Sequence, residues 1–454
     1  MVRHLTGLGL IFLGSWNGSD IEAHPAHAKP VNYPFVVGFE RFHSSLDDDG
    51  YLSEGGFILL NELNCVACHE APQAWKGRLP GLEGTRLEGV GSRLGLIDLE
   101  IMIRSPRFLK KDTTMPSLFS GPDRDLDEVK ALKHYLASLK EDFPEYPRGS
   151  VNAGRELYHR AGCVACHAPE AGYRPAGIPE NVEIEAVGLP SVPLNLANFY
   201  NHGALTHFLL HSNDHRPSGR MPQMDLTIEE ASDLAAYLKV EPDSSIPQLL
   251  AVALAQSEAF HVEPEWIEKG EALFRSKQCI ACHKVEVEDE IGVSGLAPGL
   301  DEITIEGDLG CFSVRPVGGG VPYYGLDHVQ KRAIRASLNR LNESPPPTTI
   351  AEIDWRMKQL NCYACHEHEG TGGVETARQV YFGLDKQKGA RWGGAGHLPT
   401  ALSASELRSG NGCAGGSRQG ELKSGSNGRS PSARMPVFRG DAVAEWIELL
   451  GSNR

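Results

Sequence analysis

Residues 61–70, NELNCVACHE, hold two cysteines separated by two residues, with a histidine directly after the second cysteine. The arrangement returns in AGCVACHAPE, KQCIACHKVE and LNCYACHEHE, whose first cysteines are Cys163, Cys279 and Cys362. With 10 Cys and 18 His in 454 residues, chance predicts about 0.01 such motifs. Four motifs, numbered one to four along the chain, therefore indicate a specific chemistry.

Covalent haem attachment explains this spacing, because two thiols add to the haem vinyl groups and the next imidazole binds the iron. A zinc site and a redox dithiol are the alternatives, but neither explains a histidine behind every pair. The sequence therefore predicts four covalently bound haem c groups. The expected thioether residues are Cys65, Cys68, Cys163, Cys166, Cys279, Cys282, Cys362 and Cys365, and the expected proximal ligands are His69, His167, His283 and His366.

The first 28 residues indicate export. A basic Arg3, an apolar stretch from Leu5 to Trp16 and a small-residue site ending at Ala28 are typical of a secretory signal peptide. No later segment approaches the ~18 apolar residues of a membrane span. We therefore expect a soluble, periplasmic or otherwise exported protein, which is also where haem c is attached.

The charge balance bears on the partners. A net charge of −15 argues against binding to nucleic acid or to an anionic membrane surface. A basic protein partner fits this charge, and a solvated acidic surface that binds nothing fits it equally well.

A longer repeat surrounds the first three motifs. Gly56, Gly154 and Gly270 each lie nine residues before the first cysteine of their motif and begin a helix with one apolar face. The fourth motif follows a helical pattern, IDWRMKQLNC, without that glycine.

Met-Pro followed by an amphipathic helix recurs in TTMPSLFSG, GRMPQMDLT and SARMPVFRG. Methionine sulfur is a common sixth ligand opposite histidine on haem iron, although a lone methionine is more often core filler. We therefore expect Met115, Met221 and Met435 as distal ligands of the first, second and fourth haems, with Met224 as the rival of Met221.

The helices after the first two Met-Pro pairs carry capping signals. Asp125 with Glu128, and Thr227 with Glu230, have the spacing of a capping box. Asp327 and Gln330 imitate it after the third motif.

Helix, Cys-x-x-Cys-His, variable loop, Met-Pro and helix together resemble the pattern of class I cytochrome c domains over most of residues 50–450. The resemblance implies one-electron transfer and an all-α fold of tandem small cytochrome c-like haem domains joined by irregular linkers. After a signal peptide at 1–28, the expected domains are 29–145, 150–241, an atypical 262–342, and 352–454 with an irregular insert at 401–432.

Two units depart from this pattern. In the third, Val321 stands where methionine is expected, so its haem has an open site, a histidine ligand such as His328, or the sulfur of Cys311. In the fourth, residues 401–432 are rich in Gly, Ser, Arg and Asn, which indicates either a flexible insertion or a locally shifted reading frame.

The sequence thus predicts an exported tetrahaem cytochrome that carries single electrons between a redox protein donor and acceptor. Two alternatives stay open. One is a peroxidase-like haem enzyme that uses an open site on the third haem, and the other is a cytochrome subunit that docks a periplasmic dehydrogenase. No residue is assigned a catalytic role outside the haems, because no phosphate loop, nucleotide fingerprint or Ser/His/Asp set is present.

Overall fold

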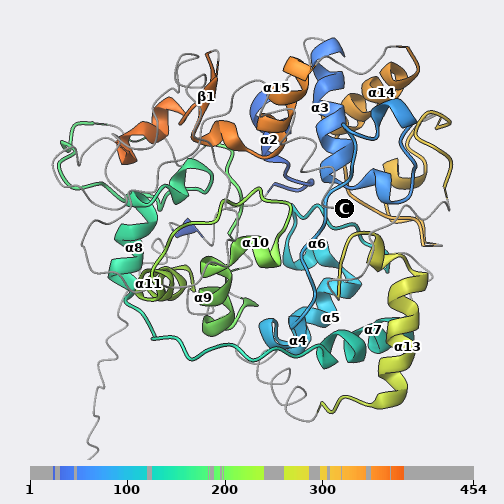
Figure 1. Cartoon of the computed structure of the whole chain (residues 1–454), viewed down its shortest axis with the longest axis horizontal. Helices are drawn as coiled ribbons and strands as arrows, with labels where there is room; N and C mark the ends of the chain where they lie inside the picture. Colours follow the sequence, from blue (N-terminus) through green and yellow to red (C-terminus); the bar gives the residue numbers. More distant parts are fainter. Residues whose placement is uncertain are drawn as a thin grey trace, which may run out of the picture.

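The structure is a computed structural model that describes residues 24–25, 31–44, 49–119, 125–182, 184, 189–194, 197, 199–239, 260–285, 297–303, 307–318, 320–343, 349–368 and 370–382. Met435, residues 401–432 and all of the expected signal peptide except residues 24 and 25 lie outside these ranges. The described chain is mainly helical, as expected (Figure 1).

Three helix pairs form the framework of the molecule. In Figure 1 the first two pairs lie on the right and the third lies on the left. The pairs are α3 (Asp49–Glu62) with α14 (His328–Glu343), α7 (Leu126–Ser138) with α13 (Pro264–Ser276), and α8 (Val151–Arg160) with α11 (Ile228–Leu238).

The recurring glycines explain how each pair packs. A Cβ atom at any of them would collide with a backbone carbonyl of the partner helix, so glycine lets the two backbones touch. Measured from the position that such a Cβ would take, the carbonyl oxygen lies at 2.1 Å for Gly56 (Ala333), 1.9 Å for Gly154 (Asp233) and 2.1 Å for Gly270 (Ala131).

The partner helices begin at the predicted caps. The Asp125 carboxylate accepts hydrogen bonds from the N–H groups of Asp127 and Glu128 at the start of α7. Thr227 and Glu230 form a complete capping box on α11. The carbonyl that faces each glycine belongs to the residue six positions after Asp125, Thr227 or Asp327, so the three pairs cross in the same register.

The first two pairs, α3 with α14 and α7 with α13, do not follow chain order. Helix α3 leads into the first motif, yet its partner α14 follows the third motif. Helix α13 leads into the third motif, yet its partner α7 follows the first. The two units therefore exchange their closing helices, which differs from the sequential domains predicted at 29–145 and 262–342. Among the described residues, only the unit within 150–241 pairs the helix before its motif with the helix after it.

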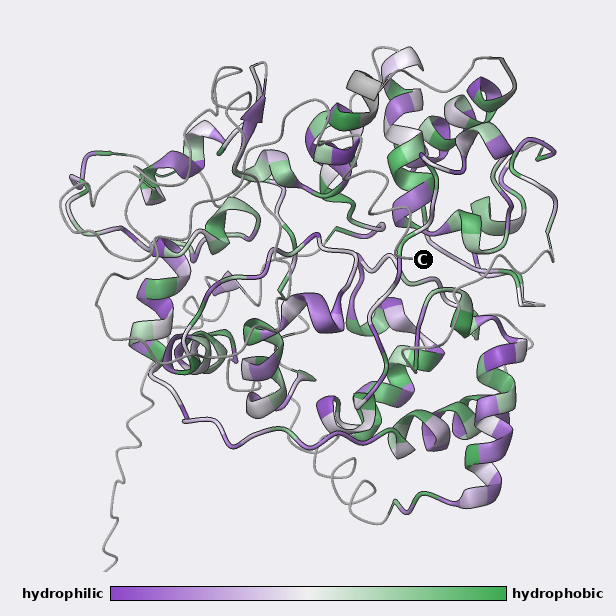
Figure 2. Cartoon of the chain, in the orientation of Figure 1, coloured by the Kyte–Doolittle hydropathy of each residue, from purple (hydrophilic) through white to green (hydrophobic). Residues whose placement is uncertain are grey.

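Hydrophobic cores confirm this exchange. One core joins Leu52, Phe57 and Leu60 of α3 to Ala333 and Ile334 of α14. A second joins residues of α7 to residues of α13, and the third lies within the 150–241 unit. In Figure 2, apolar residues (green) alternate with hydrophilic ones (purple) along α13, as expected for a helix with one buried face.

Further elements lie outside the three helix pairs and the four motifs. They are α2 (Val37–Phe42), α4 (Val90–Arg93), α5 (Leu96–Arg104), α6 (Pro106–Leu109), α9 (His202–Leu210), α10 (Ser212–His215), α15 (Thr349–Gln359), β1 (Glu367–His368) and β2 (Thr371–Gly372), with 3₁₀ turns η3 (Gln73–Trp75), η8 (Gly310–Phe312) and η10 (Thr376–Tyr381). Strands β1 and β2 pair antiparallel. None of the helices in the described ranges is both long and apolar enough to span a membrane.

Candidate haem-attachment sites

Each motif folds as one 3₁₀ turn, and the turn is entered through a residue with a left-handed backbone. The turns are η2 (Cys65–Ala67), η4 (Cys163–Ala165), η7 (Cys279–Ala281) and η9 (Cys362–Ala364). In every motif the histidine N–H donates to the carbonyl of the first cysteine at 2.9–3.0 Å. The four motifs therefore share one local geometry, which holds each histidine one turn beyond the first thiol.

Hydrogen bonds select the ring nitrogen that is left for a metal. The Nδ1 atoms of His69, His167 and His283 bond backbone carbonyls at 2.8, 2.8 and 2.7 Å. A proton on Nδ1 leaves the lone pair on Nε2, which suits an iron ligand. His366 differs, because its Nδ1 is buried and has no hydrogen-bond partner among the described residues.

Burial favours the neutral form of three of the four histidines and of two of the thiols. It lowers the pKa of His167 to about 4 and also lowers the pKa of His283 and His366. Burial raises the pKa of the Cys163 and Cys279 thiols to about 12. Neutral imidazole and protonated thiol suit a histidine–iron bond and thioether links.

A zinc site has less support from the donor arrangement. Zinc requires thiolates, usually four ligands around one point. Within the described residues, no three His, Cys, Asp or Glu side chains converge in a way that could hold a metal ion. The motifs themselves therefore fit haem better than zinc.

The carbonyls that orient the histidines also show the exchange between the first and third units. His69 bonds the carbonyl of Pro298, which follows the third motif, and His283 bonds that of Thr85, which follows the first. A second pair of bonds repeats this, from Leu300 N–H to the Glu70 carbonyl at 2.9 Å and from Leu87 N–H to the Lys284 carbonyl at 2.8 Å. The histidine of the second motif is oriented by the segment that follows the same motif, because His167 bonds the Val192 carbonyl.

The loops that carry the expected distal ligands are exchanged in the same way. Met221 packs in the core that contains Cys163 and Cys166, beside its own motif. Leu118 and Phe119, just after Met115, instead pack in the core that contains Cys279. The structure therefore places the residues just after Met115 in the core of the third motif.

The loop without methionine lies at the first motif. The Tyr324 hydroxyl donates to the Leu63 carbonyl at 3.0 Å, and Cys311 packs in the same core as Cys65. The two exchanged loops meet at an antiparallel bridge between Ser117 and Tyr323, each two residues after Met115 or Val321. This symmetry links the first and third units as counterparts.

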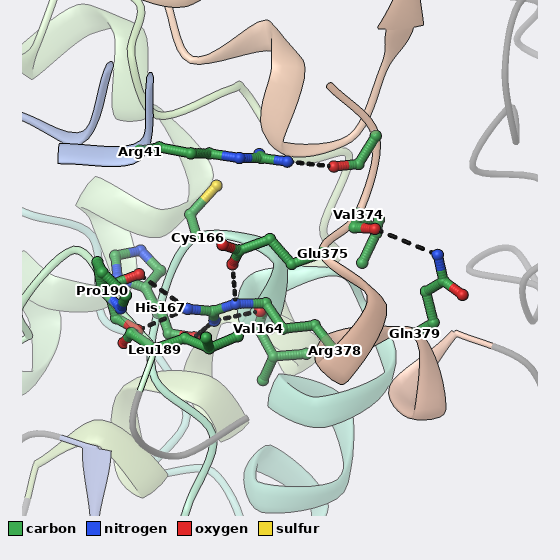
Figure 3. Close-up of polar contacts among 12 residues, drawn as sticks. Arg41, Val164, Cys166, His167, Leu189, Pro190, Val374, Glu375, Arg378 and Gln379 are labelled. Atoms are coloured by element: carbon green, nitrogen blue, oxygen red, sulfur yellow. Dashed lines mark hydrogen bonds and ion pairs between the residues drawn. The ribbon is translucent and has the colours of Figure 1, made fainter. Parts of the chain in front are cut away.

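The fourth motif lies against the second through Arg378, which the sequence analysis did not single out (Figure 3). Its guanidinium is fully buried and makes an ion pair with Glu375 at 2.7 Å. It also donates to Val164 O (2.7 Å), His167 O (2.8 Å), Pro190 O (3.0 Å) and Ser191 Oγ (2.7 Å). An isolated arginine carries no sequence signal for such a role.

Arg41 holds the fourth motif from the other side. It donates from α2 to the carbonyls of Tyr363 and Gly373, at 2.8 and 2.7 Å. Helix α2 thereby connects the beginning of the described chain to its last motif. Figure 3 shows Arg41 and Arg378 on either side of Cys166.

Comparison with known proteins finds a family match in the second unit, whose own two helices pair with each other. A family model described as Cytochrome c matches residues 151–240. No curated protein and no solved structure matches the chain. The matched segment contains the second motif, Met221 and the α8–α11 pair. The match supports a c-type cytochrome, with haem-based electron transfer as its function.

Proposed function

We propose that this protein is an exported tetrahaem c-type cytochrome that carries single electrons between redox partners. The observation that carries the proposal is that all four motifs share the turn and the histidine hydrogen bond of the motif inside the cytochrome c match. When bound, each haem supplies an iron that gains and loses one electron reversibly, at a potential set by its ligands.

The residues of the chain have distinct roles in this proposal. The paired cysteines of each motif hold the ring, and His69, His167, His283 and His366 present Nε2 to the iron. Hydrogen bonds to backbone carbonyls orient three of these imidazoles. We assign Met221 to the second haem and Met435 to the fourth.

Met115 is proposed as the distal ligand of the third haem, in place of the first. Its loop and the following helix α7 pack on the third unit. The irregular distal side, with Val321, then belongs to the first haem, and Cys311 and His328 become candidates there. If one haem has a free sixth ligand position for a peroxidase-like reaction, we propose that it is the first haem.

The partners belong to the same proposal. A net charge of −15 favours a donor or acceptor with a basic surface, and a periplasmic dehydrogenase is one such candidate. Attraction of this kind weakens with salt, so association should decline as ionic strength rises.

Haem counting tests the proposal. The exported protein, made with the haem-attachment machinery, is expected to contain four haems by pyridine haemochrome assay and by intact mass. Replacing both cysteines of one motif by alanine should remove one haem, whereas Cys311→Ala, outside the motifs, should leave the count at four. A colourless product after acid-acetone extraction, or a single haem at the second motif, would refute the tetrahaem proposal.

A further inference from the structure

Two asparagines connect motifs that lie far apart in the sequence. The Asn64 side-chain amide donates to the sulfur of Cys282 at 3.0 Å, and the Asn361 amide donates to the sulfur of Cys166 at 3.3 Å. Each asparagine immediately precedes the first cysteine of its own motif, and each sulfur belongs to the second cysteine of another motif. The same contact thus occurs twice, between the first and third motifs and between the fourth and second.

Backbone conformation explains why asparagine can make this contact. Asn64 and Asn361 have φ of 55° and 57°, in the left-handed region that asparagine tolerates better than most residues. The accepting motifs carry Gln278 and Gly162 at the same position. Gln278 donates to the nearby Arg275 carbonyl, and Gly162 has no side chain. Each pair therefore has one donating and one accepting motif.

Other contacts hold the same motifs together. The Asn64 amide also reaches the Ala281 carbonyl at 3.4 Å, and Gly84 N–H, from the segment after the first motif, bonds the Cys282 carbonyl at 2.7 Å. On the other side, Arg378 follows the fourth motif and bonds two carbonyls of the second. The asparagine contacts thus lie inside two separate motif interfaces.

We infer that the four haem-attachment motifs are held as two pairs, first with third and second with fourth, and that Asn64 and Asn361 are positioning residues that fix each pair. This inference rests on the proposed function, because each accepting sulfur is there a thioether at the edge of a haem. An amide N–H directed at that sulfur places partial positive charge next to the ring. It therefore favours the reduced, less positive form of that haem.

Glycine variants isolate the side-chain contact. Asn64→Gly and Asn361→Gly keep the positive φ, as Gly162 does naturally, and remove the side-chain amide; Asn64→Gly also removes the acceptor of Leu82 N–H. Gln278→Gly is the matched control, since its side chain bonds Arg275 instead. In a potentiometric titration, Asn64→Gly is expected to lower the equilibrium constant for reduction of one haem by about two- to tenfold. Asn361→Gly is expected to shift a different haem, and Gln278→Gly none.

The pairing has a second readout in the wild-type holoprotein. With ¹⁵N-labelled asparagine, the Asn64 side-chain signal is identified by its loss in Asn64→Gly, and Asn361 likewise. Each signal is expected to move in two steps of a redox titration, because two irons lie nearby, with no step shared between the two asparagines. Signals that follow one step each, or the same two steps, would overturn the pairing.

The remaining outcomes are also decisive. If Asn64→Gly and Gln278→Gly titrate alike, the positioning role is overturned while four counted haems preserve the proposed function. If haem is absent, the proposed function itself fails. Should Asn64→Gly not accumulate, Asn64→Asp replaces it, because aspartate tolerates the same backbone and can still accept from Leu82 N–H, with Gln278→Glu as the charge control.

Discussion

Arg378 shows how one side chain can organise a motif that lies far from it in sequence. Its guanidinium donates to four oxygens of the second motif and its downstream segment, and to Glu375. Five N–H groups in a fixed plane can satisfy such a set, which a flexible ammonium cannot. The buried charge is compensated by Glu375, so the contact stabilises the interface between the second and fourth motifs.

We therefore predict that Arg378→Lys destabilises the protein by on the order of 3 kcal/mol, because at least two buried oxygens lose their donors. Urea unfolding followed by circular dichroism measures this. Arg160→Lys, at an exposed arginine, is the control and should change stability by less than about 0.5 kcal/mol. Equal midpoints for the two variants would contradict the assigned role.

His159 gives the second unit a pH-dependent stability. Its Nδ1 donates to the Arg155 carbonyl at 2.7 Å and its Nε2 accepts from Glu170 N–H at 3.0 Å, so both nitrogens are committed to the neutral ring. Burial lowers its pKa from 6.5 to about 4. As the pH falls, the unfolded chain binds the proton before the folded chain does. The contribution of neutral His159 to the free energy of unfolding is therefore fully present above pH 6.5 and is lost as the pH falls toward 4.

The expected loss from His159 alone is on the order of 3 kcal/mol across that window. His159→Gln should therefore unfold with a shallower dependence on pH than the wild type, and unfolding at a series of pH values measures it. His261→Gln, at an exposed ring, should keep the wild-type dependence. If both variants give the wild-type slope, protonation of His159 is not coupled to unfolding.

At the level of elements, three glycines allow the backbones of three helix pairs to touch where they cross. Because a Cβ atom at Gly154 would lie 1.9 Å from the Asp233 carbonyl, the backbones of α8 and α11 must separate to admit it. The turn that carries the second motif follows α8 directly. The crossing therefore also controls where Cys163 and His167 lie.

Gly154→Ala is expected to cost about 1–3 kcal/mol through overpacking, despite the better helix propensity of alanine. Thermal unfolding measures the effect. Gly203→Ala in α9 is the matched control, since its added Cβ would meet its nearest atom at 3.6 Å, an ordinary contact. That variant should gain up to about 1 kcal/mol. A neutral Gly154→Ala would show that the helices do not cross this closely.

At the level of the whole molecule, the exchange of closing helices joins the two halves of the chain. Helices α3 and α7 come from the first half, and their partners α14 and α13 come from the second. Burial of both interfaces thus depends on residues before 240 and after 259. Sequential domains would instead bury each core within one continuous segment.

A protease site inserted between residues 245 and 255 tests this arrangement. The two fragments are expected to stay together in size-exclusion chromatography after cleavage and to separate in denaturant, because two helix interfaces hold them. A cleaved chain that also carries Gly56→Leu and Gly270→Leu should come apart at a lower denaturant concentration than the cleaved wild type, since both crossings are then blocked while the contacts of Arg41 and Arg378 between the fragments remain. Free fragments from the cleaved wild type would disprove the exchange.

The local features of this protein follow from its sequence alone. The Cys-x-x-Cys-His spacing and the caps at Asp125, Thr227 and Asp327 each act within one turn or one helix, so their pattern predicts their structure. They were enough to indicate an all-α fold, the candidate thioether residues and the cytochrome c resemblance, which the family match supports for residues 151–240.

Which helices and motifs pack against one another is visible only in the folded chain. The glycine, the facing carbonyl and the cap recur in the same register in all three pairs, so α3 could accept α7 or α14 equally well by pattern. The choice depends on side-chain packing between segments far apart in the chain, as does the contact between Asn64 and Cys282. Such contacts form between surfaces that meet only in the folded chain, and no local spacing in the sequence encodes them.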